Sequence, residues 1–204
     1  MLTEHLQSNQ KIFIFQRKEM AELFSFETRN KYSIELENGR LIGFAVEEGK
    51  SLGHFFWRQI LGHWRSFSIR ILDSEKQTVL MAVHPFRFFF ERLEVLRGDG
   101  KKIGIVQRRF NPFFKRFDIL DEQGNLLLEV AGPLWKPWTF PFFKNGDEVA
   151  KVFKKWSGLF KEAFTDSDNF TIEFNNSLTI KDRELILAAT FLIDIVFFEK
   201  KASR

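Results

Sequence analysis

The chain has 204 residues with a formal net charge of +4 at pH 7, and it contains 27 Phe, 5 Trp, 1 Tyr and no Cys. This length suits one domain with a substantial core, and the lack of Cys excludes disulfides and Cys-based zinc sites. No stretch reaches about 18 apolar residues, which excludes a transporter with many membrane-spanning helices.

The first part of the chain predicts short strands joined by turns. Residues 1–10 carry Glu4 and lack an apolar core region, so we expect an N-terminal extension that is not a signal peptide. Asn38-Gly39 is a strong hairpin signal, because both residues tolerate the positive φ of a type I′ turn. Pro85 breaks the pattern because it cannot donate to a strand ladder. We expect strands at 11–16, 23–26, 31–36, 40–46, 65–72 and 77–83, and a long loop over 47–63.

The middle of the chain repeats one pattern. Gly-bearing turns at Gly100, Gly124 and Gly146 recur every 22–24 residues. Short strands at regular spacing with such turns indicate a meander that closes into a barrel or a sandwich. The expected strands lie at 93–97, 101–107, 116–120, 126–130, 140–143, 148–153 and 170–174.

The C-terminal residues predict a helix at about 180–198 that is apolar on all sides. Thr179 followed by Asp182 resembles a capping box and marks its start. From Leu185 to Phe198 only Thr190 and Asp194 are polar. The apolar part reaches roughly 21 Å, short of the ~30 Å hydrocarbon core of a bilayer. We therefore expect a helix enclosed by a closed sheet, and a single membrane anchor is the alternative. The residues buried in one case and in lipid in the other are Leu185, Leu192, Asp194 and Phe197.

Three strings of residues carry a resemblance to a known family. They are Lys-Lys-Trp-Ser-Gly at 154–158, Phe-Thr-Asp-Ser-Asp-Asn-Phe at 164–170 and Phe-Leu-Ile-Asp at 191–194. Together with segments at 26–32 and 132–133, they resemble the phospholipid scramblase family. Members of this family, within the LURP-one-related superfamily, adopt the tubby-like fold.

The resemblance extends from about residue 15 to residue 199. It implies one mainly β domain over 11–200, in which a closed barrel of about twelve strands encloses the C-terminal hydrophobic helix. The implied activity is ATP-independent, bidirectional movement of phospholipids between membrane leaflets, modulated by calcium. A peripheral module that recognises anionic lipid or a partner protein, without transport, is the alternative.

The expected location is the cytoplasmic side, peripheral at the membrane, or a single-pass anchor by the C-terminal helix. The Pro-Phe-Arg-Phe-Phe-Phe-Glu-Arg string at 85–92 stands where eukaryotic members carry a Cys-rich, lipid-modified stretch. Membrane contact must therefore come from side chains directly. We expect no enzymatic catalysis, because the sequence has no HExxH, GxSxG or Gly-rich phosphate motif.

The resemblance places a calcium segment at 166–177. Calcium takes six to eight oxygen ligands, which a 12-residue loop supplies from spaced positions. Thr171 stands where such a loop needs Gly, and the alternation of apolar residues from 170 to 174 fits a strand. A weak calcium site and a strand preceded by an Asp-rich turn both remain open. The candidate ligands are Asp166, Asp168, Phe170, Ile172, Phe174 and Ser177.

Two segments, 101–117 and 134–144, mix basic and aromatic side chains. Basic residues near an anionic bilayer gain ~1 kcal/mol each, and Trp suits the membrane interface. Alternatively, the aromatic residues fill the barrel and the basic residues form its solvated face. Nucleic acid is an unlikely partner, because its known binding motifs are missing, but the charge does not exclude it. The lipid-contact candidates are Arg108, Arg109, Phe113, Phe114, Lys115, Arg116, Trp135, Lys136, Trp138 and Lys144.

Overall fold

The computed structural model describes residues 1–204 except 18–29, 50–66, 86–91, 156–168 and 200–204. Twelve strands form a closed antiparallel barrel, in which each strand pairs with the next one along the chain. The barrel closes where β1 (Lys11–Gln16) pairs with β12 (Asn169–Phe174). The other strands are β2 (Lys31–Glu35), β3 (Leu41–Gly49), β4 (Phe67–Asp73), β5 (Thr78–His84), β6 (Arg92–Arg97), β7 (Lys102–Arg109), β8 (Phe114–Leu120), β9 (Leu126–Pro133), β10 (Thr139–Lys144) and β11 (Asp147–Lys155).

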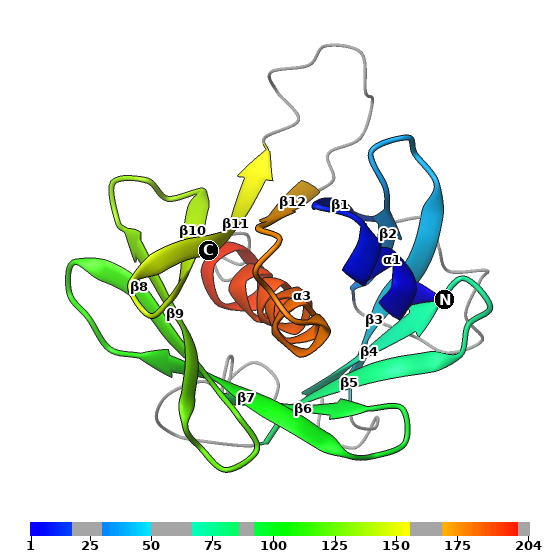
Figure 1. The fold of residues 1–204 in the computed structure, drawn as a ribbon, viewed down its shortest axis with the longest axis horizontal. Coiled ribbons are helices and arrows are strands. Elements are labelled where there is room, and N and C mark those ends of the chain that lie inside the picture. Colours follow the sequence, from blue (N-terminus) through cyan, green and yellow to red (C-terminus); the bar gives the residue numbers. More distant parts are fainter. Residues whose placement is uncertain (18–29, 50–66, 86–91, 156–168, 200–204) are drawn as a thin grey trace, which may run out of the picture.

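The helices are α1 (Leu2–Ser8), α3 (Ile180–Asp194) and the π-helical turn η4 (Ile195–Glu199). Figure 1 shows α3 surrounded by the ring of strands. The expected fold, a mainly β closed barrel around a C-terminal helix, is confirmed.

Most expected strands are present, with shifted ends. The turns at Gly39, Gly100, Gly124 and Gly146 all have positive φ, which explains why Gly marks them. The expected loop over 47–63 is wrong at its start, because β3 continues to Gly49 and Glu47 pairs with Ile69 of β4. The rest of that loop from residue 50, and the expected strand at 23–26, lie outside the described residues.

The helix α3 is the core of the barrel. Every residue from 185 to 193 is at most 1% exposed. Thr190 donates its hydroxyl to the Ile186 carbonyl at 2.9 Å, so its polar group is satisfied within the apolar interior. Gly104 of β7 lets the helix approach, because a Cβ there would lie 2.9 Å from a methyl carbon of Leu185. These contacts place the helix inside the barrel, as expected.

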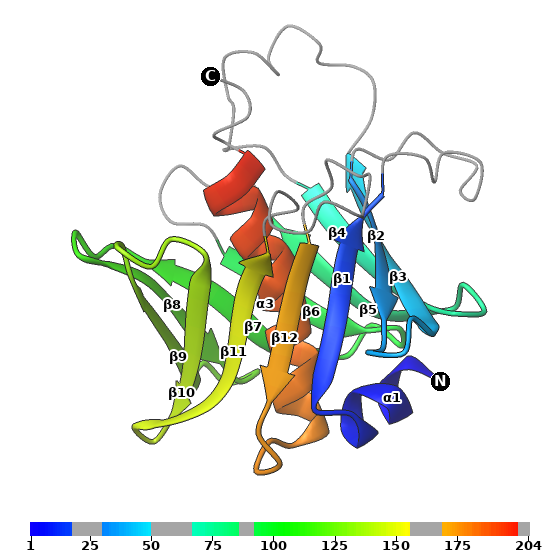
Figure 2. The same ribbon diagram turned by 90° about the horizontal axis from the view of Figure 1, so that it is seen from above.

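The barrel has two different ends, which Figure 2 shows from the side. At one end lie α1, the start of α3 and the hairpin turns such as that between β10 and β11. We call this the turn end. At the other end lie η4 and the connections β7–β8 and β9–β10. We call this the loop end.

The helix α1 covers the turn end. Its Leu2 and Leu6 are fully buried. Arg183 of α3 donates to the carbonyl oxygens of Leu6 and Asn9, each at 2.7 Å, and to that of Asn175 at 3.3 Å. Residues 1–10, expected as an extension, therefore form part of the closure of the barrel.

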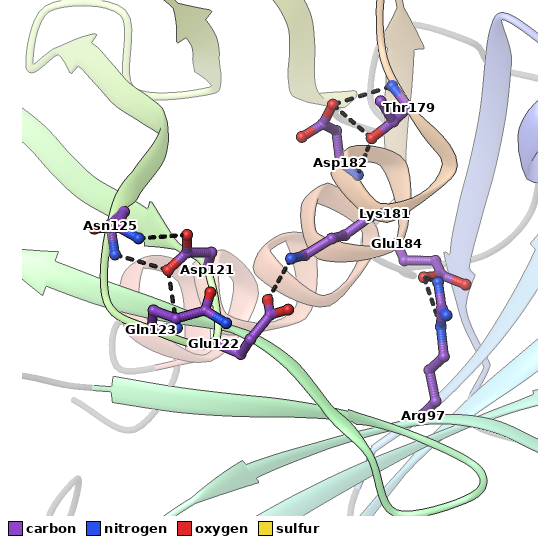
Figure 3. A network of polar contacts seen from close by, with 9 residues as sticks. All are labelled: Arg97, Asp121, Glu122, Gln123, Asn125, Thr179, Lys181, Asp182 and Glu184. Carbon is purple, nitrogen blue, oxygen red and sulfur yellow. Dashed lines mark hydrogen bonds and ion pairs between the residues drawn. The ribbon is translucent and has the colours of Figure 1, made fainter.

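The start of α3 is held by charged side chains (Figure 3). The capping box is present: Thr179 accepts from the Asp182 N–H at 3.2 Å, and the Asp182 carboxylate accepts from the Thr179 N–H at 3.0 Å. The first two turns of the helix add two ion pairs to hairpins of the barrel, Arg97 with Glu184 at 2.8 Å and Lys181 with Glu122. The helix is thus anchored to the β6–β7 and β8–β9 hairpins.

Candidate functional site

Two loops at the loop end, residues 110–113 and 134–138, lie side by side. They follow β7 and β9, and the intervening β8 pairs with both of those strands. The Leu134 N–H donates to the Phe113 carbonyl at 3.3 Å. The rings of Phe114 and Trp135 are 6.2 Å apart. The two loops therefore form one continuous surface.

This surface collects exposed apolar side chains. Phe110 is 80% exposed, Trp135 73% and Phe113 68%. Among the described residues nine large apolar side chains are exposed, and six of them are here. We call these six the apolar patch: Phe110, Phe113, Phe114, Leu134, Trp135 and Trp138.

Four members of the apolar patch were predicted from the sequence as lipid-contact residues, and Phe110 and Leu134 were not. Phe110 is two residues before Pro112, and Leu134 directly follows Pro133. A turn at each Pro was the signal that could have found them, because a residue at a turn has few neighbours to cover it.

The first loop is held by Asn111. Its side-chain oxygen accepts from the N–H groups of Phe113 and Phe114, each at 2.9 Å. Such an Asx turn fixes the backbone without a core contact. The two Phe side chains are therefore presented from an ordered loop while they remain exposed.

The second loop is held from inside by Lys115. Its ammonium donates to the carbonyl oxygens of Lys136, Pro137 and Thr139 at 2.7, 3.0 and 3.0 Å. It also lies 3.9 Å from the centroid of the Phe140 ring. Burial lowers the pKa of Lys115 to about 8.

Lys115 and Lys144 thus differ from the expectation that they contact lipid. Lys115 is buried because it points into the barrel, where it supports the loop of Lys136. Lys144 lies at the turn end, where its ammonium pairs with Asp182 at 2.8 Å. We leave both out of the candidate surface.

The remaining basic candidates lie beside the apolar patch. Lys136 is exposed at the tip of the second loop. Arg108 turns toward the barrel mouth, where its guanidinium lies 5.4 Å from the Phe197 ring centroid. Arg109 and Arg116 face each other across β7 and β8 on the outside of the barrel. Three of these four cations therefore flank the patch on its outer side.

The barrel mouth links the patch to the end of the helix. Tyr32 donates its hydroxyl to the buried carboxylate of Asp194 at 2.7 Å, and Lys154 lies 3.8 Å from the same carboxylate. The Lys154 ammonium is 3.9 Å from the centroid of the Phe198 ring. On its other side Phe198 is stacked with Trp138 of the patch, with 5.4 Å between ring centroids.

The remaining helix candidates are also inside. Leu185 and Leu192 are fully buried, and Phe197 packs edge-on against Phe117. Within the described ranges, no helix combines the length and the apolar character that crossing a membrane requires.

The calcium candidates are divided. Asp166 and Asp168 lie outside the described residues. Phe170, Ile172 and Phe174 are buried in β12, whose backbone pairs with β1 on one side and β11 on the other. Ser177 lies in an exposed turn after β12. The described part of the chain contains no group of three or more His, Asp or Glu side chains suited to a metal ion. Calcium binding stays a prediction.

Comparison with known proteins decides the family. The family model described as Scramblase matches residues 1–200. The chain belongs to the scramblase family. It is 33% identical to human phospholipid scramblase 1 over 217 residues, covering 98% of this chain and 67% of that protein. It is 32% identical to rat phospholipid scramblase 1, covering 97% of this chain and 62% of that protein's length.

The fold has a counterpart among solved structures. The crystal structure of a protein from Arabidopsis thaliana superposes with a TM-score of 0.53 at 13% identity. The match covers 98% of this chain and 96% of that one. This likeness supports the tubby-like barrel that the sequence led us to expect, and it concerns the fold alone.

Proposed function

We propose that this scramblase-family chain promotes ATP-independent, bidirectional movement of phospholipids between leaflets, and that it contacts the bilayer through the apolar patch. The names of its relatives support the activity. The place of contact is supported by one observation: most of the exposed large apolar side chains among the described residues gather on two adjacent loops.

The chemistry of the patch suits the surface of a bilayer. Trp and Phe side chains gain free energy on leaving water for the interfacial region. Transfer of one such side chain contributes about 2 kcal/mol. Lys136 at the tip of the second loop adds ~1 kcal/mol near anionic lipid. The charges of Arg109 and Arg116 beside the patch are offset by ion pairs with Asp118 and Glu129. The proposed contact is therefore reversible and sensitive to salt.

A second function is favoured by the filled interior. Among the described residues α3 fills the interior of the barrel, and they leave no path for lipid through it. If lipids move, they move along the outside, where inserted aromatic side chains disturb the packing of head groups. A module that binds anionic lipid or a partner without transport needs no path at all, and it is the second candidate.

The test uses reconstituted vesicles that carry a fluorescent phospholipid in both leaflets and a membrane-impermeant quencher added outside. We expect wild-type protein to expose the inner lipid to the quencher, without ATP. The variant Phe113→Ser with Trp135→Ser should lose scrambling and bind anionic vesicles about tenfold or more weakly. The matched control is Leu126→Ser, an exposed apolar residue of the turn end, which should behave as wild type.

Two results would change the conclusion. Bound protein without lipid movement above protein-free vesicles rejects scrambling and favours the non-transporting module. Equal vesicle binding by the double variant and the control rejects the apolar patch as the contact. Repeating the assay with calcium and with a chelator tests the proposed calcium modulation.

A further inference from the structure

A small cleft lies on the outside of the barrel next to the apolar patch. Its volume is about 340 Å³, and it is lined by Arg109, Phe110, Arg116 and Asp118. Ligand sites in proteins begin at about 300 Å³. The cleft is thus large enough for the polar head of a lipid.

The strand register arranges the charges in two rows. Arg109 of β7 is directly opposite Arg116 of β8, next to the loop that carries Phe110. Asp118 is directly opposite Glu129 of β9. Along a strand these rows are two residues, about 7 Å, apart. The positive row therefore lies nearer to the apolar patch than the negative row.

The arginines keep hydrogen-bonding capacity for a ligand. Arg109 uses its Nε for the Asp118 carboxylate, at 2.5 Å. Its two terminal amino groups make no hydrogen bond to any described residue, and its side chain is half exposed. Arg116 uses one terminal amino group for Glu129, at 2.9 Å. Guanidinium groups with unused donors bind phosphate through paired hydrogen bonds.

The carboxylates of Asp118 and Glu129 make the cleft unsuitable for an anion that carries no positive group. Asp118 in the lining and Glu129, the ion-pair partner of Arg116 outside it, balance the two guanidinium groups, so the net charge of these four residues is zero. Asp118 is only 7% exposed, and its Oδ1 has no hydrogen-bond partner among the described residues. The Nε of Arg116 is 3.9 Å from this oxygen, beyond hydrogen-bond distance. A buried carboxylate oxygen without a donor is costly. This oxygen is shielded from solvent, so a positive group at the surface of the cleft stabilises it through charge and not through a direct hydrogen bond.

We propose that this cleft binds a zwitterionic phospholipid head group, which carries a phosphodiester and an ammonium group. The phosphodiester lies on Arg109 and Arg116, and the ammonium approaches Asp118, with the face of Phe110 as a further cation partner. The proposal rests on the proposed function, because a membrane lipid reaches the cleft only when the apolar patch contacts the bilayer. The apolar patch brings the protein to the membrane, and the cleft selects the head group.

The first experiment uses water-soluble probes and the full chain. Glycerophosphoethanolamine carries both groups, glycerol phosphate lacks the ammonium, and inorganic phosphate lacks both the ammonium and the glycerol. Calorimetric titration and the NMR signals of the arginine Nε–H groups report binding and its location. We expect the zwitterion to bind most tightly and to shift the Arg109 signal.

Variants locate the effect. Arg109→Gln should weaken binding of the zwitterion about tenfold, and Asp118→Asn should remove the preference for the zwitterion over glycerol phosphate. The control Arg40→Gln changes an exposed arginine at the turn end and should bind as wild type. Circular dichroism and the urea midpoint confirm that each variant is folded. Equal or tighter binding of glycerol phosphate or inorganic phosphate by wild type overturns the proposal, and so does an unchanged Arg109 signal.

A vesicle experiment separates this inference from the proposed function. If wild type binds anionic vesicles but no soluble zwitterion, the cleft proposal fails and the apolar patch stands. If the soluble zwitterion binds at Arg109 but vesicles do not, the membrane contact fails and the cleft stands.

Discussion

The two ends of the barrel use different residue types for different purposes. At the turn end, charged side chains such as Arg183, Glu184 and Asp182 bind other parts of the chain. At the loop end, aromatic side chains such as Phe113 and Trp135 face outward. Both ends close the same sheet, so the sheet does not impose the difference. The turn end stabilises the fold, and the loop end exposes the apolar patch.

One charged residue of the loop end is buried and binds other parts of the chain, as the charged residues of the turn end do. Lys115 is buried and binds three carbonyl oxygens, as Arg183 does at the opposite end. A buried cation bound to carbonyl groups thus holds α1 at one end and the second loop of the apolar patch at the other. Changing each one tests whether the ends are independent.

The largest effect is expected for Arg183→Leu. This change leaves the carbonyl groups of Leu6, Asn9 and Asn175 without their donor and releases α1 from the helix. We expect the free energy of unfolding to fall by about 3–4 kcal/mol, measured by urea denaturation. Arg40→Leu is the control, with a change within about 0.5 kcal/mol. A loss no greater than that of the control would show that α1 does not depend on Arg183.

The second effect concerns pH and Lys115. Its pKa in the folded protein is about 8, below its ordinary value of 10.5. Between these values the unfolded chain holds more protons than the folded one, so stability rises with pH in this window. The gain reaches at most about 3 kcal/mol. Urea denaturation of wild type and Lys115→Met between pH 7 and pH 10 measures it. A constant difference between the two proteins over this range would contradict the burial of a charged Lys115.

A smaller loss of stability is expected when either of two glycines is replaced, one required by close packing and the other by a positive φ. Gly132 at the loop end makes room for Lys115, because a Cβ would lie 2.7 Å from the Thr139 carbonyl oxygen and 3.2 Å from Lys115 Cε. Gly146 at the turn end has open space around it and a φ of +92°. We expect Gly132→Ala to cost about 2 kcal/mol and Gly146→Ala about 1 kcal/mol.

Matched Asn variants distinguish the two causes. Asn tolerates positive φ, so Gly146→Asn should cost less than Gly146→Ala. At residue 132 the larger Asn should cost more than Ala. The reverse order at either position, measured from urea midpoints, would contradict the role assigned to that glycine.

Much of the fold followed from local signals in the sequence. The positive-φ turns at Gly39 and Gly146 marked the hairpins, and Thr179 with Asp182 marked the start of the helix. The end of β3 was missed, because Glu47 is charged and the sequence gives no sign of the strand that covers it.

The candidate site was harder to predict, because a list of charges does not say where each one points. Lys115 and Arg116 are neighbours in one strand, so they project to opposite faces. The inward Phe117, two residues after Lys115, assigns Lys115 to the interior. Lys144 was grouped with Trp138 by sequence distance, although a strand separates them and places them at opposite ends of the barrel.

The position of α3 in the chain determines when the protein can fold. The core of the barrel is the helix α3, which follows all twelve strands, and the barrel closes by pairing β1 with β12, more than 150 residues later. During synthesis, the strands leave the ribosome before α3 does. Their apolar inner faces therefore stay uncovered until the helix is made. Chaperone demand should therefore be greatest just before residues 180–194 emerge, and chains that stop short of α3 should aggregate rather than form a smaller barrel.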